Sequence, residues 1–296
     1  MVIHLNISSM KNLLSSCVKV VFLVILFAFS ANAQKLPNVQ EASLRAPATI
    51  KIDGKSTEWN NQFQAYNKAT EIFYTISNDN EKLYLTVQAT DLDIINKIIC
   101  AGIIFTINGT GKMKDQEGMA ITFPVLHEGD FPHDSHGSLI APPVNLDKPD
   151  SWSADTFLVV LNKDLTSKAK DIRVTGGKEI TNSLISIYNP YGIKVAALVD
   201  NNTNFTYELA VPLKYLGLSV NNSKPFVYNI KLKSLEGGTI GLEDRSFVIA
   251  LRAQRRERRA HLIVSRNESK TVTVYDDRML NLLNPTDFWG EYTLAK

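Results

Sequence analysis

The histidine-rich stretch HEGDFPHDSH, residues 127–136, has the side-chain types of a divalent-metal site. It places three imidazoles and several carboxylates close together, and both groups ligate divalent metals in proteins. The spacing matches no standard zinc motif, and a solvated polar loop would have a similar composition. A metal site is therefore one of two alternatives for this loop, and its candidate ligands are His127, His133, His136, Asp130 and Asp134.

Carbohydrate binding is the second candidate chemistry. It needs exposed aromatic faces with polar side chains around them. Trp152, in the loop KPDSWSAD, is the best-placed aromatic residue in the sequence. Tyr188 and Tyr191 flank the Asn-Pro turn of IYNPYG and come next. The alternative for Trp152 is that its indole covers an edge of the core.

The only dense basic run is LRAQRRERRAHL, residues 251–262. The arginine guanidinium binds carboxylates and phosphates through two parallel hydrogen bonds, so Arg255 and Arg256 are candidates for contacting an acidic sugar or another anion. The alternative is a solvated hairpin connection between the two flanking apolar segments.

The sequence carries no motif of a known catalytic machinery. It lacks the Gly-x-Ser-x-Gly, His-Glu-x-x-His and phosphate-loop patterns. Asp and Glu are plentiful, which leaves a glycoside-active role open, but no pattern places two carboxylates opposite each other. We therefore predict a protein that is not an enzyme. The one cysteine beyond residue 33, Cys100, lies in the apolar run IICAGIIF and predicts a buried thiol.

Residues 1–33 have the features of a secretory signal peptide. Two lysines precede the apolar run VVFLVILFAF, and SANAQ follows with an A-x-A cleavage pattern. The run is shorter than the roughly 20 residues of a membrane-spanning helix, so we predict no membrane anchor after cleavage. The expected location is secreted or periplasmic.

The charge of the exported chain is balanced. Residues 1–33 contain two of the 32 basic residues and none of the 30 acidic residues, so the remaining chain carries 30 of each. A neutral balance gives no reason to expect nucleic acid or an anionic membrane as a partner.

The rest of the chain has the pattern of many short strands separated by turns. EIFYTISN and KLYLTVQAT, joined by DNE, predict a β-hairpin over residues 71–90. IKIDG predicts a short strand followed by a turn at Asp53-Gly54, and Trp59 is expected to cap one end of the core. Helical periodicity is expected only at 91–99 and 212–218. Further strands are predicted at 101–108, 119–124, 156–161, 184–188, 193–199, 205–211, 226–233, 246–251, 271–275 and 287–294.

This pattern predicts an all-β protein, an antiparallel β-sandwich with long loops and one or two short helices. Residues 34–46 are polar and bounded by prolines, which predicts a linker, and residues 47–296 are expected to form a single domain. The segment 109–153 is rich in Gly, Pro, Asp and His, and long loops of this kind often carry function.

Several landmarks, taken in order, resemble the carbohydrate-binding module family 9-like domains of the wider DOMON-like group. Those domains open with a strand, an Asp-Gly turn and an acidic-Trp pair, as in IKIDGKSTEWN. They continue with a hairpin whose second strand reads LYL and ends in Asp, here Asp91, then with a segment matched by YELAVPL and a last strand matched by FWGEYTL. The resemblance covers residues 46–296. It implies a jelly-roll or immunoglobulin-like sandwich that binds a poly- or oligosaccharide.

The resemblance also implies ligands and cofactors. Family 9-like modules sandwich the sugar between two tryptophans, and two such loop tryptophans cannot be assigned in this chain. Related sandwiches hold calcium through loop carboxylates, for which the candidates are Asp91, Asp93, Asp130 and Asp155. Some DOMON-like relatives bind haem through an axial His or Met, for which the candidates are the three loop histidines with Met113, Met119 and Met279.

The sequence thus predicts an exported, non-catalytic glycan-binding protein, with no certain cofactor and calcium left open. A haem- or metal-binding protein, or a cell-envelope adaptor without a small ligand, are the alternatives.

Overall fold

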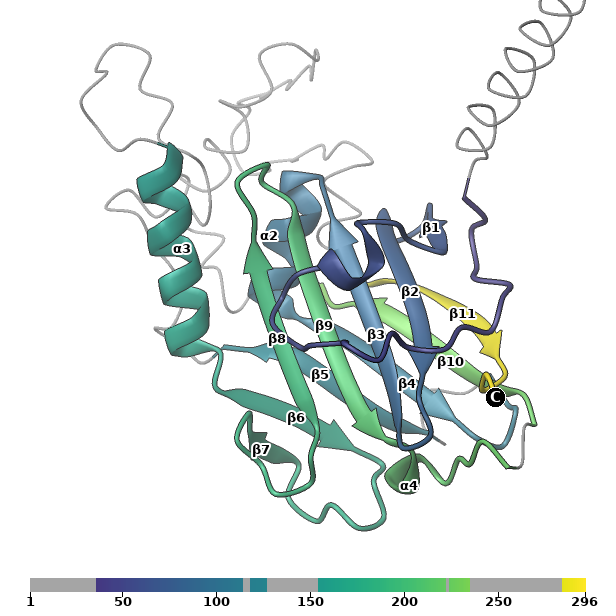
Figure 1. Ribbon diagram of the computed structural model, residues 1–296. Helices are drawn as coiled ribbons and strands as arrows, with labels where there is room; N and C mark the ends of the chain where they lie inside the picture. Colours follow the sequence, from purple (N-terminus) through teal and green to yellow (C-terminus); the bar gives the residue numbers. More distant parts are fainter. Residues whose placement is uncertain (1–35, 114–117, 127–153, 222–223, 235–283) are drawn as a thin grey trace, which may run out of the picture. The chain divides into compact units, whose positions relative to one another are not determined.

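Two antiparallel sheets, here called sheet A and sheet B, form the framework of the described chain (Figure 1). The computed structural model describes residues 36–113, 118–126, 154–221, 224–234 and 284–296. The strand order is β1-β2-β3-β9-β8 in sheet A and β11-β10-β4-β5-β6-β7 in sheet B. Rings from the two sheets meet in the interior, where the centroids of Tyr74 and Phe288 are 5.1 Å apart. The predicted all-β class, with two packed antiparallel sheets, is confirmed.

The elements have the following bounds. Sheet A consists of β1 (Ala65–Asn67), β2 (Ile72–Asn78), β3 (Lys82–Ala89), β9 (Phe205–Pro212) and β8 (Lys194–Val199). Sheet B consists of β11 (Thr286–Tyr292), β10 (Phe226–Leu232), β4 (Ile103–Asn108), β5 (Met119–Val125), β6 (Asp171–Thr175) and β7 (Leu184–Ser186). The helices are the 3-10 helix η2 (Thr57–Trp59) and α2 (Leu92–Ala101), α3 (Ala154–Lys168) and α4 (Leu213–Leu216).

The β2–β3 hairpin forms where the sequence predicts it, because both the alternation and the turn chemistry are local. Leu83, Leu85 and Val87 are buried in the core. Asp79 closes the turn by accepting hydrogen bonds at Oδ1 from the backbone N–H groups of Glu81 and Lys82, both at 2.7 Å. Helix α2 also lies where it is expected.

The strand predicted at residues 50–52 is wrong, because this segment pairs with no other strand. Strands β1 and β6 were not predicted; β1 has only three residues. The strands predicted at 246–251 and 271–275 lie outside the described residues.

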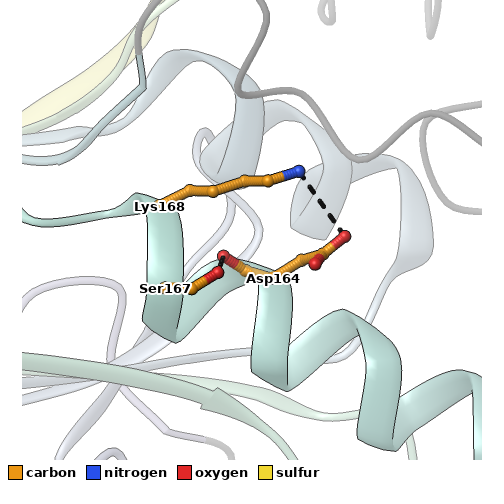
Figure 2. Close-up of polar contacts among 3 residues, drawn as sticks. All are labelled: Asp164, Ser167 and Lys168. Carbon is orange, nitrogen blue, oxygen red and sulfur yellow. Dashed lines mark hydrogen bonds and ion pairs between the residues drawn. The ribbon is translucent and has the colours of Figure 1, made fainter.

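Residues 156–161, predicted as a strand, belong instead to helix α3. The run TFLVVL has strand-like composition, but Leu161 and Leu165, one helical turn apart, are both buried in the core. The last turns of α3 carry an ion pair at 3.6 Å between Asp164 Oδ2 and Lys168 Nζ (Figure 2). Such a pair, four residues apart, adds a few tenths of a kcal/mol to a helix. Packing of the two leucines therefore overrides the strand propensity of the preceding residues.

Residues 37–46, which the sequence assigns to the linker, lie along the outer edge of β2. The Gln40 side-chain amide bonds β2 there as the backbone of a neighbouring strand would. Its Nε2 donates to the carbonyl of Ile76 at 2.8 Å, and its Oε1 accepts from the Ile76 N–H at 2.7 Å. Leu44 and Ala46 continue the edge with backbone hydrogen bonds to Asn78. This segment covers the part of β2 that the short strand β1 leaves unpaired.

The Tyr207 hydroxyl is buried in the core and has no hydrogen-bond partner in the described chain. A buried polar group without a partner costs free energy. Tyr207→Phe is therefore expected to raise the free energy of unfolding by about 1 kcal/mol. Urea denaturation should show this as a higher midpoint with an unchanged slope. A lower midpoint would show that the hydroxyl has a partner such as a buried water.

Candidate functional site

The segment between β7 and β8, residues 186–193, is held in one conformation by the side chain of Asn189; we call it the tyrosine loop. Asn189 Nδ2 donates to the carbonyls of Ser186 and Ile193, both at 2.9 Å. Its Oδ1 accepts from the N–H groups of Tyr191 at 3.1 Å and Ile193 at 3.3 Å. One amide therefore ties together both ends and the middle of the loop. Asn favours turns because it can bond the nearby backbone in this way.

The Tyr188 ring projects from the tyrosine loop into solvent. Tyr188 is 79% exposed, which is the largest exposed fraction among the large hydrophobic residues that the structure describes. The Lys170 ammonium lies 5.8 Å from the ring centroid, within the range of a cation–π contact. The backbone beside it is fixed, because the Ile187 N–H donates to the Lys170 carbonyl at 2.9 Å. Tyr188 thus offers an aromatic face with a cation beside it on a rigid support.

Tyr191 is placed differently. Its ring meets that of Tyr215 edge to face, with centroids 5.9 Å apart, and both side chains pack partly against the core. The Lys214 ammonium lies 4.7 Å from the centroid of the Tyr215 ring. Of the two predicted tyrosines, the structure therefore exposes Tyr188 and uses Tyr191 to anchor the loop.

The remaining predicted ligand-binding and metal-ligating residues lie outside the described residues. They are Trp152, Arg255, Arg256, His127, His133, His136, Asp130 and Asp134. Within the described ranges, no three His, Cys, Asp or Glu side chains are grouped so that they could hold a metal ion.

The structure describes some of the residues predicted to bind calcium or haem, and it places them in different elements and surroundings. Asp91 caps helix α2, with Oδ1 accepting from the N–H groups of Asp93 at 3.0 Å and Ile94 at 3.3 Å. Met119 is buried in the core, and Met113 is exposed. Asp155 falls in α3, and Met279 lies outside the described residues. Cys100, on α2, is half-buried, and burial raises the pKa of its thiol to about 12, which disfavours a thiolate role.

A buried carboxyl group that the sequence did not assign to a site lies on the outer face of sheet A. Glu208, in the middle of β9, is fully buried. Its Oε2 accepts hydrogen bonds from the backbone N–H groups of Asp53 and Gly54, both at 2.9 Å. Residues 47–62, which we call the strap, cross this face, with η2 on them (Figure 1). Glu208 is therefore the hydrogen-bonding anchor of the strap.

The strap can approach the sheet this closely because residue 54 is a glycine. A Cβ on Gly54 would come within 2.9 Å of the Leu198 Cβ, and its φ of +81° also favours glycine. The Asp-Gly pair is thus a turn that delivers two N–H donors to one carboxylate oxygen. Trp59, in η2, is half-buried and is not part of the core, so the prediction that it caps the core is wrong.

The environment of Glu208 favours its neutral form. Burial raises the pKa of Glu208 to about 7, the two backbone hydrogen bonds oppose this rise, and the charges of Asp53 and Glu58 add to it. Its second oxygen, Oε1, is buried and has no partner among the described residues. The sequence signal is a single glutamate inside the apolar strand YELAVP, whose neighbours on both sides are buried.

A second buried charged group, Lys97 on α2, anchors the start of β11. Its Nζ donates to the Asn284 carbonyl at 2.8 Å and to the Thr286 hydroxyl at 3.1 Å. Burial lowers the pKa of Lys97 to about 8, and Glu71 opposes this change. The contacts assign Lys97 a structural role, because they hold the residues at the start of β11 against α2.

Comparison with known proteins adds no family to this geometry. No family model matches the chain, and no curated protein matches it significantly. Among the helices of the described residues, none combines the length and the apolar character needed to cross a membrane.

Proposed function

We propose that the protein is an exported, non-catalytic carbohydrate-binding domain that contacts a poly- or oligosaccharide through the tyrosine loop. The observation that carries this proposal is the 79% exposed Tyr188 on a loop whose backbone is fixed by Asn189. Affiliation with the family 9-like or DOMON-like sandwiches, and with a jelly-roll or immunoglobulin-like subtype, belongs to the same proposal.

The physical argument rests on preorganisation. The C–H-rich face of a pyranose packs against an aromatic ring and removes apolar surface of both partners from water. Tyrosine suits this contact because it presents a large area with few rotatable bonds. A loop that is already ordered loses little entropy on binding. The Lys170 ammonium beside the ring can donate hydrogen bonds to sugar hydroxyls or to a sugar carboxylate.

A glycan array followed by titration of the best ligand tests this proposal. Tyr188→Ala is expected to weaken that binding by about tenfold or more, because the stacking face is lost. Tyr188→Phe keeps the face and should retain most of the affinity. Met113→Ala, which removes another exposed apolar side chain, is the matched control and should bind as the wild type does.

Two results would contradict the proposal. One is the absence of binding to any glycan by the wild-type protein. The other is binding that Tyr188→Ala leaves unchanged, which would move the site to another surface.

A further inference from the structure

Strand β8 is the last strand of sheet A among the described residues, so one of its edges faces away from β9. The turn after β8 shows which of its residues form hydrogen bonds to β9 and which point to the free edge. The Asp200 N–H donates to the Asn204 carbonyl at 2.9 Å, which makes this pair hydrogen bonded. In an antiparallel ladder such pairs alternate, so the even-numbered residues of β8 bond to β9. The N–H and C=O groups of the odd-numbered residues point to the free edge.

Both ends of this free edge are capped by asparagine side chains. At one end, Asn189 of the tyrosine loop bonds the N–H and the C=O of Ile193. At the other end, Asn162 of α3 accepts from the Val199 N–H and donates to its carbonyl, both at 2.8 Å. Figure 1 shows α3 beside β8 at this end.

Between the caps, Val195 and Ala197 remain. Their outward N–H and C=O groups have no hydrogen-bond partner in the described chain. Lys194, Ala196 and Leu198 project from the outer face of the sheet, and β8 is only partly buried along most of its length. Unpaired groups on an edge strand are a template for another strand. We call the open edge at Val195 and Ala197 the window. It is short, because Asn189 and Asn162 cap the edge on either side of it.

We propose that two copies of this chain associate by antiparallel pairing of their β8 edges around a two-fold axis at Ala196. In this register Val195 of each copy exchanges both hydrogen bonds with Ala197 of the other copy. All the unpaired groups of the window are then satisfied. The next pair outward would be Ile193 opposite Val199 of the other copy, but there the capping asparagines stand between the two backbones, so the ladder between the copies ends at Val195 and Ala197. Any other antiparallel register places an open group opposite a capped one.

The side chains fit this register as well. Ala196 meets its own copy at the axis, in a non-hydrogen-bonded pair, where the strands approach most closely and a small residue is needed. Lys194 lies opposite Leu198 of the other copy. Leu198 is covered by the Asp53-Gly54 turn of its own chain, so the exposed Lys194 approaches the exposed Asp53 of the second copy. The two-fold axis repeats this pairing of opposite charges.

Sedimentation velocity of the purified protein over a concentration series tests the association, with Ala197→Pro as the main variant. Proline removes the outward N–H of residue 197 and leaves the ladder to β9 intact, and edge strands tolerate proline in such positions. Ala197→Pro is expected to weaken dimerisation by about tenfold or more, because each copy loses one hydrogen bond across the axis. Asn201→Pro is the matched control: Asn201 is exposed in the turn closed by the Thr203 N–H and the Asp200 carbonyl. It should dimerise as the wild type does.

Two further measurements keep the test decisive if Ala197→Pro fails to fold. Ala196→Lys places two cations opposite each other at the axis and should also weaken the dimer. Amide hydrogen exchange of Val195 and Ala197 in the wild type should slow as the protein concentration rises.

The proposal is overturned if the wild-type protein stays monomeric up to about 1 mM. It is also overturned if a dimer forms while the Val195 and Ala197 amides exchange at the monomer rate, or if the folded variants dimerise with unchanged affinity.

Discussion

Gly290→Ala is expected to lower the free energy of unfolding by about 3 kcal/mol, as overpacking a tight core does. Gly290, in β11, lies directly across from Tyr228 of β10. A Cβ on residue 290 would overlap the Cζ and hydroxyl oxygen of the Tyr228 ring. The ring or the strand must then move.

Tyr228 has little room to move. It is fully buried, its hydroxyl is 3.0 Å from that of Tyr74, and its ring contacts those of Phe105 and Phe288. The Tyr74 hydroxyl in turn accepts from the Gln40 N–H at 2.8 Å. Displacing Tyr228 therefore disturbs both sheets and the segment that covers the edge of β2.

Chemical denaturation measures this effect. Gly109→Ala is the matched control, because a Cβ there would meet Leu218 at an ordinary contact distance of 3.6 Å. The control is expected within about 0.5 kcal/mol of the wild type. A Gly290→Ala protein as stable as the control would show that the ring can shift without cost.

The second large effect is a fall in stability as the pH rises towards neutrality, caused by Glu208. Its pKa is about 7 in the folded protein, against an ordinary value of 4.5. A carboxyl group with a raised folded-state pKa binds more protons when folded than when unfolded. Between about pH 4.5 and pH 7, the free energy of unfolding therefore decreases with rising pH, by an amount on the order of 3 kcal/mol for this group.

Glu208→Gln is expected to remove this dependence. The amide oxygen can still accept from the N–H groups of Asp53 and Gly54, and no charge is buried at any pH. The variant should match the wild type near pH 4 and exceed its stability at pH 8. Thermal or urea unfolding across this range measures both curves.

Glu291→Gln, which changes an exposed glutamate on β11, is the control and should follow the wild-type curve. Parallel curves for the wild type and Glu208→Gln would show that water reaches Glu208 and holds its pKa near the ordinary value.

The candidate site was only partly predictable. The motif IYNPYG identifies a turn with two tyrosines, because Asn-Pro chemistry is local. It does not indicate which ring is exposed. Which ring is exposed depends on Tyr215, which packs against Tyr191. Tyr215 lies in α4, more than twenty residues further along the chain. The importance of Glu208 was equally hidden, because its partners in the strap are about 150 residues away.

The sequence by itself determined the features that depend on neighbours along the chain. These are the alternating strands, the β2–β3 turn at Asp79 and the helix that Asp91 caps. The tertiary structure alone decided that residues 154–168 form a helix, that Glu208 is buried, and that Val195 and Ala197 stay open between two asparagine caps. Burial and edge pairing depend on residues far apart in sequence, and a local pattern holds no information about which distant segment will cover it.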